Sequence, residues 1–504
     1  MKKQLKTLSL LMALIMVIGV AFSIACFADD QSATTSITPD TSWYDKNSKT
    51  KTATLRDAAD LAGFSAICTT ETQFLFGWTI KLGDDIVYNT GNAADFATTA
   101  PTNVWTPVAE FWGTFDGQGY VVSGLYVKDA AKTHIGLFGI INGATVKNVS
   151  VVNSYFEGKT KMGGIIGEAK ELTCTISNCY SDAIISSNPA EHDGAYCGGI
   201  IGYMTAPTSL VENCWFAGSI TASSDVNDNY GTRCGGIVGN AQNENTETST
   251  IKNCLVTGSI TAQTQLGGII GAAREKGETG TVIENCLMLG TMRATRDNPS
   301  LFFGQFAGVW KNGYKITLKN VYGLDTFEVT VDSEKFTADK KLGLYNVGGS
   351  GVVVADNSAK VTLASITGDT AKTTLGSFDF DGEDAIWATV ADGTPVIKAL
   401  AYIAANKASG LDPAPADPVE DDNTNNENND NNENTTPDTD SGSSSETNAV
   451  ETNASTEAST EVSTDAATDA ATEQPKGCGS SLMGAGAVIL VASLGVAFTG
   501  KKRD

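Results

Sequence analysis

The middle of the chain repeats one pattern of hydrophobic and polar positions. Each unit holds three short hydrophobic runs, of the forms Ile-x-Asn-Cys, Ser-Ile-Thr-Ala and Gly-Gly-Ile-Ile-Gly. The units align on asparagines that are 30, 35, 40, 32 and 35 residues apart: Asn148, Asn178, Asn213, Asn253, Asn285 and Asn320. Asn and Gly accept left-handed backbone and so mark turns between short strands. Three strand-like runs per unit predict one turn of a coil.

Runs this short cannot bury their apolar side chains alone. Stacking one unit on the next at about 4.8 Å places the aliphatic positions in one continuous interior. The pattern therefore predicts an all-β fold, a parallel β-helix, in which the aligned asparagines stack their side-chain amides as a structural ladder. Extra residues enter between the runs at 186–196, 223–233 and 240–249, so the loops of variable length cluster on two edges of the coil.

Four complete glycine runs carry a family resemblance: Gly163–Gly167, Gly198–Gly202, Gly235–Gly239 and Gly267–Gly271. Together with the Asn-Cys and Gly-Ser-Ile runs, they resemble the GLUG motif of bacterial surface proteins. The resemblance covers Phe111 to about Val331, and its first and last units lack the full glycine run and carry Val in place of Cys. It implies a right-handed β-helix exposed on a cell surface, and it supplies little mechanism.

The ends of a β-helix are sheet edges that must be covered. Leu55–Phe64 has apolar residues at helical spacing after Thr54, which predicts a short N-terminal capping helix. We expect strands at Phe76–Ile86 and Trp105–Val108. At the other end, Phe378–Ile397 resembles the closing segment of such repeats.

These boundaries divide the chain into six parts. They are a signal peptide (1–28), an N-terminal cap with entry strands (29–110), GLUG-type β-helix repeats (111–331), the C-terminal end or cap of the β-helix (332–405), a disordered acidic stalk (406–476) and a transmembrane or sorting segment (477–504).

The two termini predict export and anchoring. Lysines precede an apolar run at 8–25 and small residues end it at Ala28, as in a secretory signal peptide. A lipoprotein signal with Cys26 as acceptor and an uncleaved anchor are the alternatives. The apolar segment 482–498 is followed by basic residues, which favours a membrane span with a cytoplasmic end. Whether this segment is retained or processed stays open.

Charge excludes one class of partner. The chain has 58 acidic and 34 basic residues, a net charge of −24, and 17 of the acids lie in 411–475, which contains no base. A nucleic-acid binder would need a basic surface, so no nucleic acid is expected. The stalk is also poor in apolar residues, and such a composition predicts disorder.

Candidate chemistry is sparse. With only two histidines, His134 and His192, neither beside a recognisable catalytic companion, we predict no catalytic residue, cofactor or metal ligand. The acid-amide cluster Asp225–Asn229 breaks the pattern of an EF-hand loop, because Tyr230 stands at its glycine position. A solvated loop is the favoured interpretation there, with a bound ion as the alternative.

Ten cysteines in an exported protein raise the question of disulfides. The position after the ladder asparagine holds cysteine in four units and valine in two: Val149, Cys179, Cys214, Cys254, Cys286 and Val321. Thiols that alternate with plain hydrophobic residues favour packing in the core. Disulfides and a metal site are the alternatives.

Four aromatic residues in or near the loops form a candidate platform for sugar rings: Tyr196, Tyr203, Trp215 and Tyr230. We therefore expect a non-catalytic adhesion, binding or display module on the bacterial envelope, with an extracellular glycan or a host or neighbour-cell surface component as partner. The alternatives are a carbohydrate-active enzyme, either a polysaccharide lyase or a glycoside hydrolase, and a purely architectural envelope protein.

The predicted topology is testable on intact cells. Protease added outside should release a fragment spanning 29–405, because the stalk is exposed and the basic end after Phe498 lies inside. Immunoblotting of the supernatant measures the release, with a cytoplasmic protein as the lysis control. Protection of the domain while the envelope is intact would contradict the topology.

Overall fold

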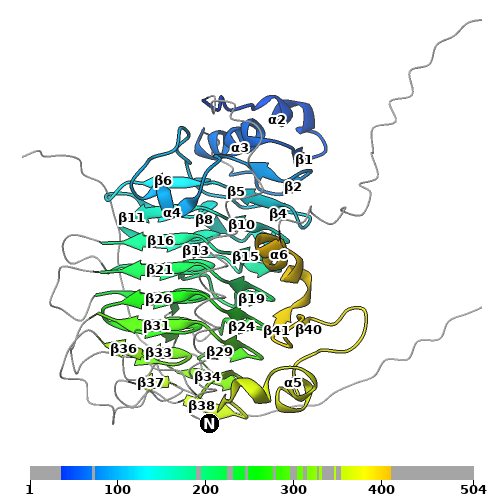
Figure 1. Cartoon of the computed structure of the whole chain (residues 1–504). Coiled ribbons are helices and arrows are strands. Elements are labelled where there is room, and N and C mark those ends of the chain that lie inside the picture. The colour runs from blue at the N-terminus through cyan, green and yellow to red at the C-terminus, as the bar shows by residue number, and fades with distance from the viewer. Residues whose placement is uncertain are drawn as a thin grey trace, which may run out of the picture. The chain divides into compact units, whose positions relative to one another are not determined.

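The computed structural model describes residues 36–70, 74–188, 194–223, 231–243, 248–275, 280–295, 303–309, 315–325, 329–331, 345–347 and 353–409. All of them belong to one compact unit, Met1–Asp422. Its strands stack into a coil with helices at the N-terminal end and along one side (Figure 1). The fold is a parallel β-solenoid, as the repeats predicted, and its handedness stays a prediction.

The coil consists of five parallel sheets. Sheet A contains β1 (Thr52–Leu55), β2 (Thr79–Leu82), β4 (Thr114–Asp116), β9 (Thr145–Lys147), β14 (Thr175–Ser177), β19 (Leu210–Glu212), β24 (Thr250–Lys252), β29 (Thr281–Glu284), β34 (Ile316–Lys319) and β38 (Val353–Asp356). Sheet B contains β3 (Ile86–Val87), β5 (Val121–Ser123), β10 (Ser150–Val152), β15 (Tyr180–Ser181), β20 (Trp215–Phe216), β25 (Leu255–Val256), β30 (Leu287–Met288), β35 (Tyr322–Leu324) and β39 (Ala359–Val361).

The other three sheets complete each coil. Sheet D contains β6 (Tyr126–Lys128), β11 (Tyr155–Gly158), β16 (Ile184–Ser187), β21 (Ser219–Ala222), β26 (Ser259–Ala262), β31 (Thr291–Ala294) and β36 (Val329–Val331). Sheet E contains β7 (Thr133–Ile135), β12 (Thr160–Gly163), β17 (Tyr196–Gly198), β22 (Arg233–Gly235), β27 (Gln265–Gly267) and β32 (Phe303–Gly304). Sheet C contains β8 (Phe138–Asn142), β13 (Ile166–Lys170), β18 (Ile201–Met204), β23 (Val238–Asn243), β28 (Ile270–Glu275), β33 (Ala307–Val309) and β37 (Tyr345–Val347).

One coil runs through sheets A, B, D, E and C before it returns to A. After β9, β10, β11, β12 and β13, strand β14 pairs in parallel with β9, so that Ile176 lies beside Val146. Each unit therefore forms five strands instead of the three expected, because two of the three runs bend and contribute two strands each. The Asn-containing run turns from sheet A into sheet B, and the glycine run turns from sheet E into sheet C.

The ladder asparagines make the first of these turns. All six have positive φ, between 51° and 54°. Four of them donate a hydrogen bond from Nδ2 to Oδ1 of the asparagine in the preceding coil at 2.9 to 3.1 Å: Asn178, Asn213, Asn253 and Asn320. Asn148 donates to the Asp116 carboxylate at 2.9 Å. Each amide thus holds a left-handed turn and joins neighbouring coils.

Glycine is required at the corner between sheets E and C. A Cβ on Gly202 would lie 2.4 Å from the backbone nitrogen of Met162, and a Cβ on Gly198 would lie 1.9 Å from the carbonyl oxygen of Ile201. These distances are shorter than any real carbon contact, and the opposing atoms are backbone. The Gly-Gly-x-x-Gly run is therefore a steric requirement of this corner.

The cysteines pack in the interior. All eight cysteines in the described part of the chain are free thiols and buried. The series Cys179, Cys214, Cys254 and Cys286 lies on successive coils with no exposed surface. Burial raises the pKa of the Cys254 thiol well above its ordinary value, so the thiol stays protonated and unreactive.

Helix α3 (Ala58–Thr70) covers the N-terminal end of the core, and α2 (Ser42–Asn47) lies beside it (Figure 1). The predicted start at Leu55 is wrong, because Leu55 belongs to β1 and the Asp57 carboxylate accepts the N–H groups of Ala59 and Asp60. That carboxylate is the N-cap that Thr54 was expected to supply. Phe64 packs edge-on against Phe111 with ring centroids 5.4 Å apart.

The entry strands differ from the expectation. Phe76–Ile86 contains only β2 and the first residue of β3, and Trp105–Val108 forms no strand. Val108 makes an isolated parallel bridge to Phe138. Nearby, α4 (Ala93–Phe96) packs over the outer face of sheet D, where Phe96 lies edge-on to Tyr126.

The C-terminal segment, defined here as residues 362–409, returns along the outside of sheet B. It contains η2 (Leu363–Ser365), α5 (Asp369–Thr374), the antiparallel pair β40 (Trp387–Thr389) and β41 (Pro395–Ile397), and α6 (Lys398–Ser409). Figure 1 shows α6, β41 and β40 beside the coil rather than across its end. The segment covers an outward row of sheet B that forms a second hydrophobic cluster: Tyr180, Trp215, Leu255, Leu287 and Tyr322.

Several predictions from the termini lie outside the described residues. These are the signal peptide, the stalk from residue 410 onward and the membrane segment 482–498. Residues 406–409, assigned to the stalk from the sequence, belong to α6. Among the residues that the structure describes, no helix is long and apolar enough to span a membrane.

The glycine corner predicts a large effect from one methyl group. Gly202→Ala should lower the free energy of unfolding by about 2 kcal/mol or more, because the new Cβ collides with backbone that cannot move alone. Gly376→Ala is the control, since its Cβ would meet the Thr373 carbonyl oxygen at an ordinary 3.5 Å. Urea unfolding of both variants measures the difference. Equal, small effects would contradict the steric account.

The packing role of the thiols predicts tolerance of valine. Cys254→Val should cost less than about 1.5 kcal/mol, as volume-conserving core substitutions do. Cys254→Asp should be far more destabilising, because it buries an unpaired charge. Thermal unfolding and non-reducing mass spectrometry test this. A large loss in the valine variant, or a bond between Cys214 and Cys254, would rule out simple packing.

Candidate functional site

The outward side chains of sheets E and C meet at the glycine corner. Along sheet E the in-register positions alternate with buried core residues such as Cys197 and Leu266, and so point away from the core. We call the outward residues of both sheets the corner row. It consists of His134, Lys161, Tyr196, Arg233 and Gln265 on sheet E and Glu168, Tyr203, Asn240 and Ala272 on sheet C.

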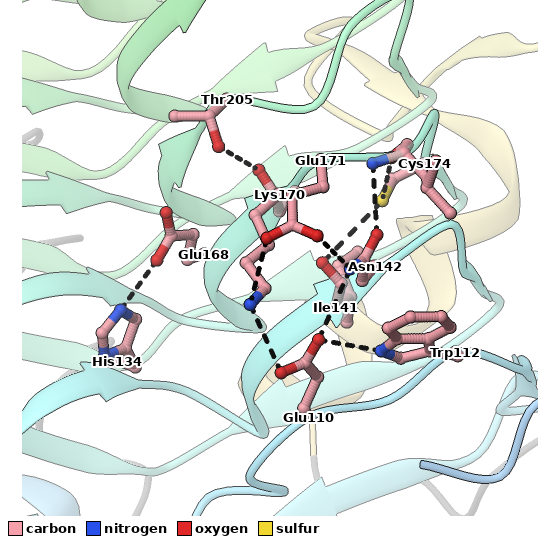
Figure 2. Close-up of polar contacts among 12 residues, drawn as sticks. Glu110, Trp112, His134, Ile141, Asn142, Glu168, Lys170, Glu171, Cys174 and Thr205 are labelled. Atoms are coloured by element: carbon pink, nitrogen blue, oxygen red, sulfur yellow. Dashed lines mark hydrogen bonds and ion pairs between the residues drawn. The ribbon is translucent and has the colours of Figure 1, made fainter. Parts of the chain in front are cut away.

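The row begins with a buried ionised carboxylate. Glu168 Oε2 lies 2.7 Å from His134 Nε2 and 2.8 Å from Lys161 Nζ. In Figure 2 the His134 and Glu168 side chains point toward one another. Burial opposes ionisation, but the hydrogen bonds and charges of His134 and Lys161 hold the pKa of Glu168 below its ordinary value. Thr133 Oγ1 contacts His134 Nδ1 at 2.8 Å.

Aromatic rings and cations alternate in the middle of the row. Lys161 Nζ lies 4.9 Å from the ring centroid of Tyr203, and the rings of Tyr203 and Tyr196 are 5.2 Å apart. The guanidinium of Arg233 lies over the other ring, 4.6 Å from the Tyr196 centroid. Both tyrosines keep part of their surface exposed. Burial raises the pKa of Tyr203 to about 12, so the hydroxyl stays protonated.

The row continues with polar groups that lack partners. Arg233 is 1% exposed and Asn240 is 0% exposed. Arg233 Nε donates to Gln265 Oε1 at 3.2 Å, but Nη1 has no hydrogen-bond partner, and neither has Nδ2 or Oδ1 of Asn240. Burial lowers the pKa of Arg233. Among the residues that the structure describes, no carboxylate forms an ion pair with this guanidinium.

The structure separates the four aromatic residues proposed from the sequence. It brings Tyr196 and Tyr203 together in the corner row. Trp215 belongs to the covered row of sheet B, is 6% exposed and donates from Nε1 to Thr257 Oγ1 at 2.8 Å, so it offers no open ring face. Tyr230 lies outside the described residues, as do His192 and Asp225–Asn229.

Sequence reasoning missed several residues of the site. His134 does have hydrogen-bonding companions. Thr133 lies on the same strand, β7, and Glu168 lies on β13 of sheet C. Arg233 and Gln265 stand two residues before the glycine pair of their unit, as the predicted Tyr196 does, and repeat alignment exposes this shared position. Tyr196 and Arg233 also end two of the variable segments.

A second polar cluster lies farther along sheet C (Figure 2). Lys170 Nζ is 3.4 Å from Glu110 and 3.5 Å from Glu171. Partial burial lowers the pKa of Lys170, but the two carboxylates outweigh it and raise that pKa above its ordinary value. Trp112 donates to Glu110 at 2.8 Å, and Asn142 donates to Glu171 at 3.2 Å. Both carboxylates are tied to one cation, so this cluster joins coils rather than offering a free acid.

Within the described ranges, no group of three or more His, Cys, Asp or Glu side chains is arranged to hold a metal ion.

Comparison with known proteins gives limited matches. No protein-family model matches the chain, so the GLUG resemblance rests on the repeats themselves. Halomucin of Haloquadratum walsbyi is 26% identical over 111 residues, which are 21% of this chain and 1% of halomucin. A solved structure from Bacteroides ovatus, provisionally assigned as an immunoglobulin A1 protease, is 17% identical with a TM-score of 0.46, covering 70% of this chain and 93% of that one.

The ionised state of Glu168 predicts a pH-dependent stability difference. Because its folded pKa is depressed, Glu168 stabilises the protein above its ordinary pKa and loses this effect as pH falls through the lowered value. Glu168→Gln should therefore cost about 1 to 2 kcal/mol at pH 7, and the cost should shrink below about pH 4.

Urea unfolding at several pH values measures this difference. Glu212→Gln is the control, since Glu212 pairs with Lys252 at 2.9 Å on a more exposed surface and should change stability by less than about 1 kcal/mol. A cost at Glu168 that is independent of pH would contradict the assignment.

Proposed function

We propose that this protein is an exported, GLUG-type surface protein of a bacterium, and that it binds a glycan chain along the corner row without turning it over. The observation that carries the proposal is the unbroken series of contacts from Lys161 through Tyr203 and Tyr196 to Arg233. These residues come from three successive coils, so the row runs along the axis of the solenoid.

The chemistry of the row suits a sugar chain. A partly exposed tyrosine ring offers an apolar face and a polar hydroxyl, a combination that is frequent in recognition sites. Cations and amides on either side supply hydrogen bonds that orient a bound group. Because adjacent strands are about 4.8 Å apart, the rings and cations repeat along a straight line, which favours an extended ligand over a compact one.

The position of the row agrees with the variable loops. Tyr196 ends the segment 186–196, Arg233 ends 223–233, and Asn240 begins 240–249. Recognition residues commonly lie where loops meet a rigid scaffold, because the scaffold fixes their position while the loops vary. One end of each of these three segments therefore belongs to the corner row.

The arrangement favours binding over hydrolysis. Glycosidases use two carboxyl groups, about 5 to 9.5 Å apart, on either side of the bond that breaks. In the described part of the corner row Glu168 is the one acid, and His134 and Lys161 both hold it. A carbohydrate-active enzyme is the competing function, and it predicts products rather than a stable complex.

Surface display is part of the proposal and rests on the sequence. The predicted signal peptide, the predicted acidic stalk and the apolar segment 482–498 support an anchored extracellular domain, and the resemblance to bacterial surface repeats agrees with it. The similarity to halomucin, which covers about a fifth of this chain, is a second sequence resemblance beside that of the surface repeats.

Binding by the corner row predicts the effect of removing its rings. Tyr196→Ala and Tyr203→Ala should each weaken glycan binding about tenfold, because each loses a stacking face. Phe76→Ala is the control, since Phe76 is 64% exposed on the N-terminal cap, away from the row. Full-length protein bound to an immobilised polysaccharide panel gives the affinities.

The same samples distinguish a binding protein from a carbohydrate-active enzyme. Reducing ends and unsaturated products are measured after incubation, with and without calcium. Appearance of either product would overturn the non-catalytic assignment, and unchanged binding in both tyrosine variants would remove the corner row as the site.

A further inference from the structure

Asn240 differs from every ladder asparagine in one respect. The described ladder amides donate to one another at 2.9 to 3.1 Å, or to Asp116 in the case of Asn148. Asn240 pairs in register with Tyr203 on one side and Ala272 on the other, so neither neighbour continues an amide ladder. Both polar atoms of its side chain are buried without partners. Native proteins rarely leave such groups unsatisfied, so a donor and an acceptor from elsewhere are expected there.

Arg233 presents the same situation in the same coil. Arg233 and Asn240 occupy the positions that Tyr196 and Tyr203 hold one coil earlier, where the two rings touch across the corner. The buried Nη1 of Arg233 is a donor without an acceptor. The neighbouring coil adds Arg274, whose charge acts on Arg233 and whose Nη1 donates to Gln242 at 2.9 Å. Two guanidinium groups, those of Arg233 and Arg274, therefore lie on neighbouring coils here.

The unmet requirements define a complementary group. Arg233 Nη1 and Asn240 Nδ2 need acceptors, and Asn240 Oδ1 needs a donor. A carboxylate supplies acceptors with the geometry that a guanidinium prefers, and a neighbouring hydroxyl supplies the donor. An apolar face of the ligand next to these groups packs on the part of the Tyr196 ring that Arg233 and Tyr203 leave exposed. A carboxylated sugar combines all three features in one unit.

We infer that the corner row is selective for glycans with carboxylated sugars, and that Arg233 and Asn240 read the carboxylate while Tyr196 stacks on the ring. This inference rests on the proposed glycan binding and adds the substrate class to it. Of the acids in the chain, 17 lie in 411–475, which follows the coil in the sequence and contributes none of the corner-row residues.

The test compares three probes with the full-length protein: polygalacturonate, its carboxyl-reduced neutral form, and dextran sulfate. We expect polygalacturonate to bind at least tenfold more tightly than the other two. Arg233→Gln should reduce polygalacturonate binding about tenfold or more, so that the preference for polygalacturonate over the neutral polymer is lost. Arg293→Gln is the matched control, since it removes the same charge from the exposed face of sheet D.

A second variant keeps the result interpretable if Arg233→Gln fails to fold. Asn240→Leu replaces two unsatisfied polar atoms by an apolar group of similar size, so thermal stability should hold or rise while polygalacturonate binding falls. If the asparagine only holds an internal water, the variant binds as the wild type does, which overturns the inference.

The outcomes separate the inference from the proposed function. Equal affinity for polygalacturonate and its neutral form, with both dependent on Tyr196, retains glycan binding and overturns carboxylate selectivity. Tighter binding of dextran sulfate also overturns it. Absence of binding to every polysaccharide in the panel overturns the proposed function and this inference together.

Discussion

The close approach of two backbones at the corner between sheets E and C is the constraint on which the rest of the structure depends. No Cβ fits at Gly198 or Gly202, where backbone atoms of the same coil and the preceding coil occupy its place. The tight corner closes each coil, which lets the aliphatic positions stack into one core. It also turns the outward faces of both sheets toward each other. A structural requirement of the fold thereby creates a place where outward side chains of two sheets meet.

The side chains at that corner vary from coil to coil along the axis, while the course of the backbone stays the same. The first described coils carry a compensated charge, Glu168 with His134 and Lys161. The next carries the two tyrosines, and the one after it carries Arg233, whose Nη1 has no hydrogen-bond partner, and Asn240, whose side-chain amide has none. Since buried polar groups cost free energy unless they are paired, this gradient from satisfied to unsatisfied groups marks the second half of the row as the place where a ligand has most to offer.

The repeat pattern of the sequence was sufficient to predict the solenoid, because a solenoid depends on the periodicity of its residues alone. Asparagines at one repeat position and glycines at another were sufficient to infer stacked coils, and the start of α3 was missed by three residues because Asp57 is a stronger N-cap than Thr54. The site was harder to predict. Trp215 and Tyr196 look alike in sequence, as aromatics near repeat runs, but the C-terminal segment covers one and not the other. That distinction depends on packing against the C-terminal segment, residues 362–409, which lies far from Trp215 in the sequence and which no local pattern encodes.

Hydrogen–deuterium exchange with and without polygalacturonate tests the central claim most directly, since it locates a ligand without any substitution. Exchange rates report local opening of the backbone, and a bound ligand slows them where it contacts strands. The account predicts slower exchange at 196–204 and 233–243, with no change at 79–87 or 387–397. Protection confined to the N-terminal cap or to the C-terminal segment, with the corner strands unaffected, would contradict it.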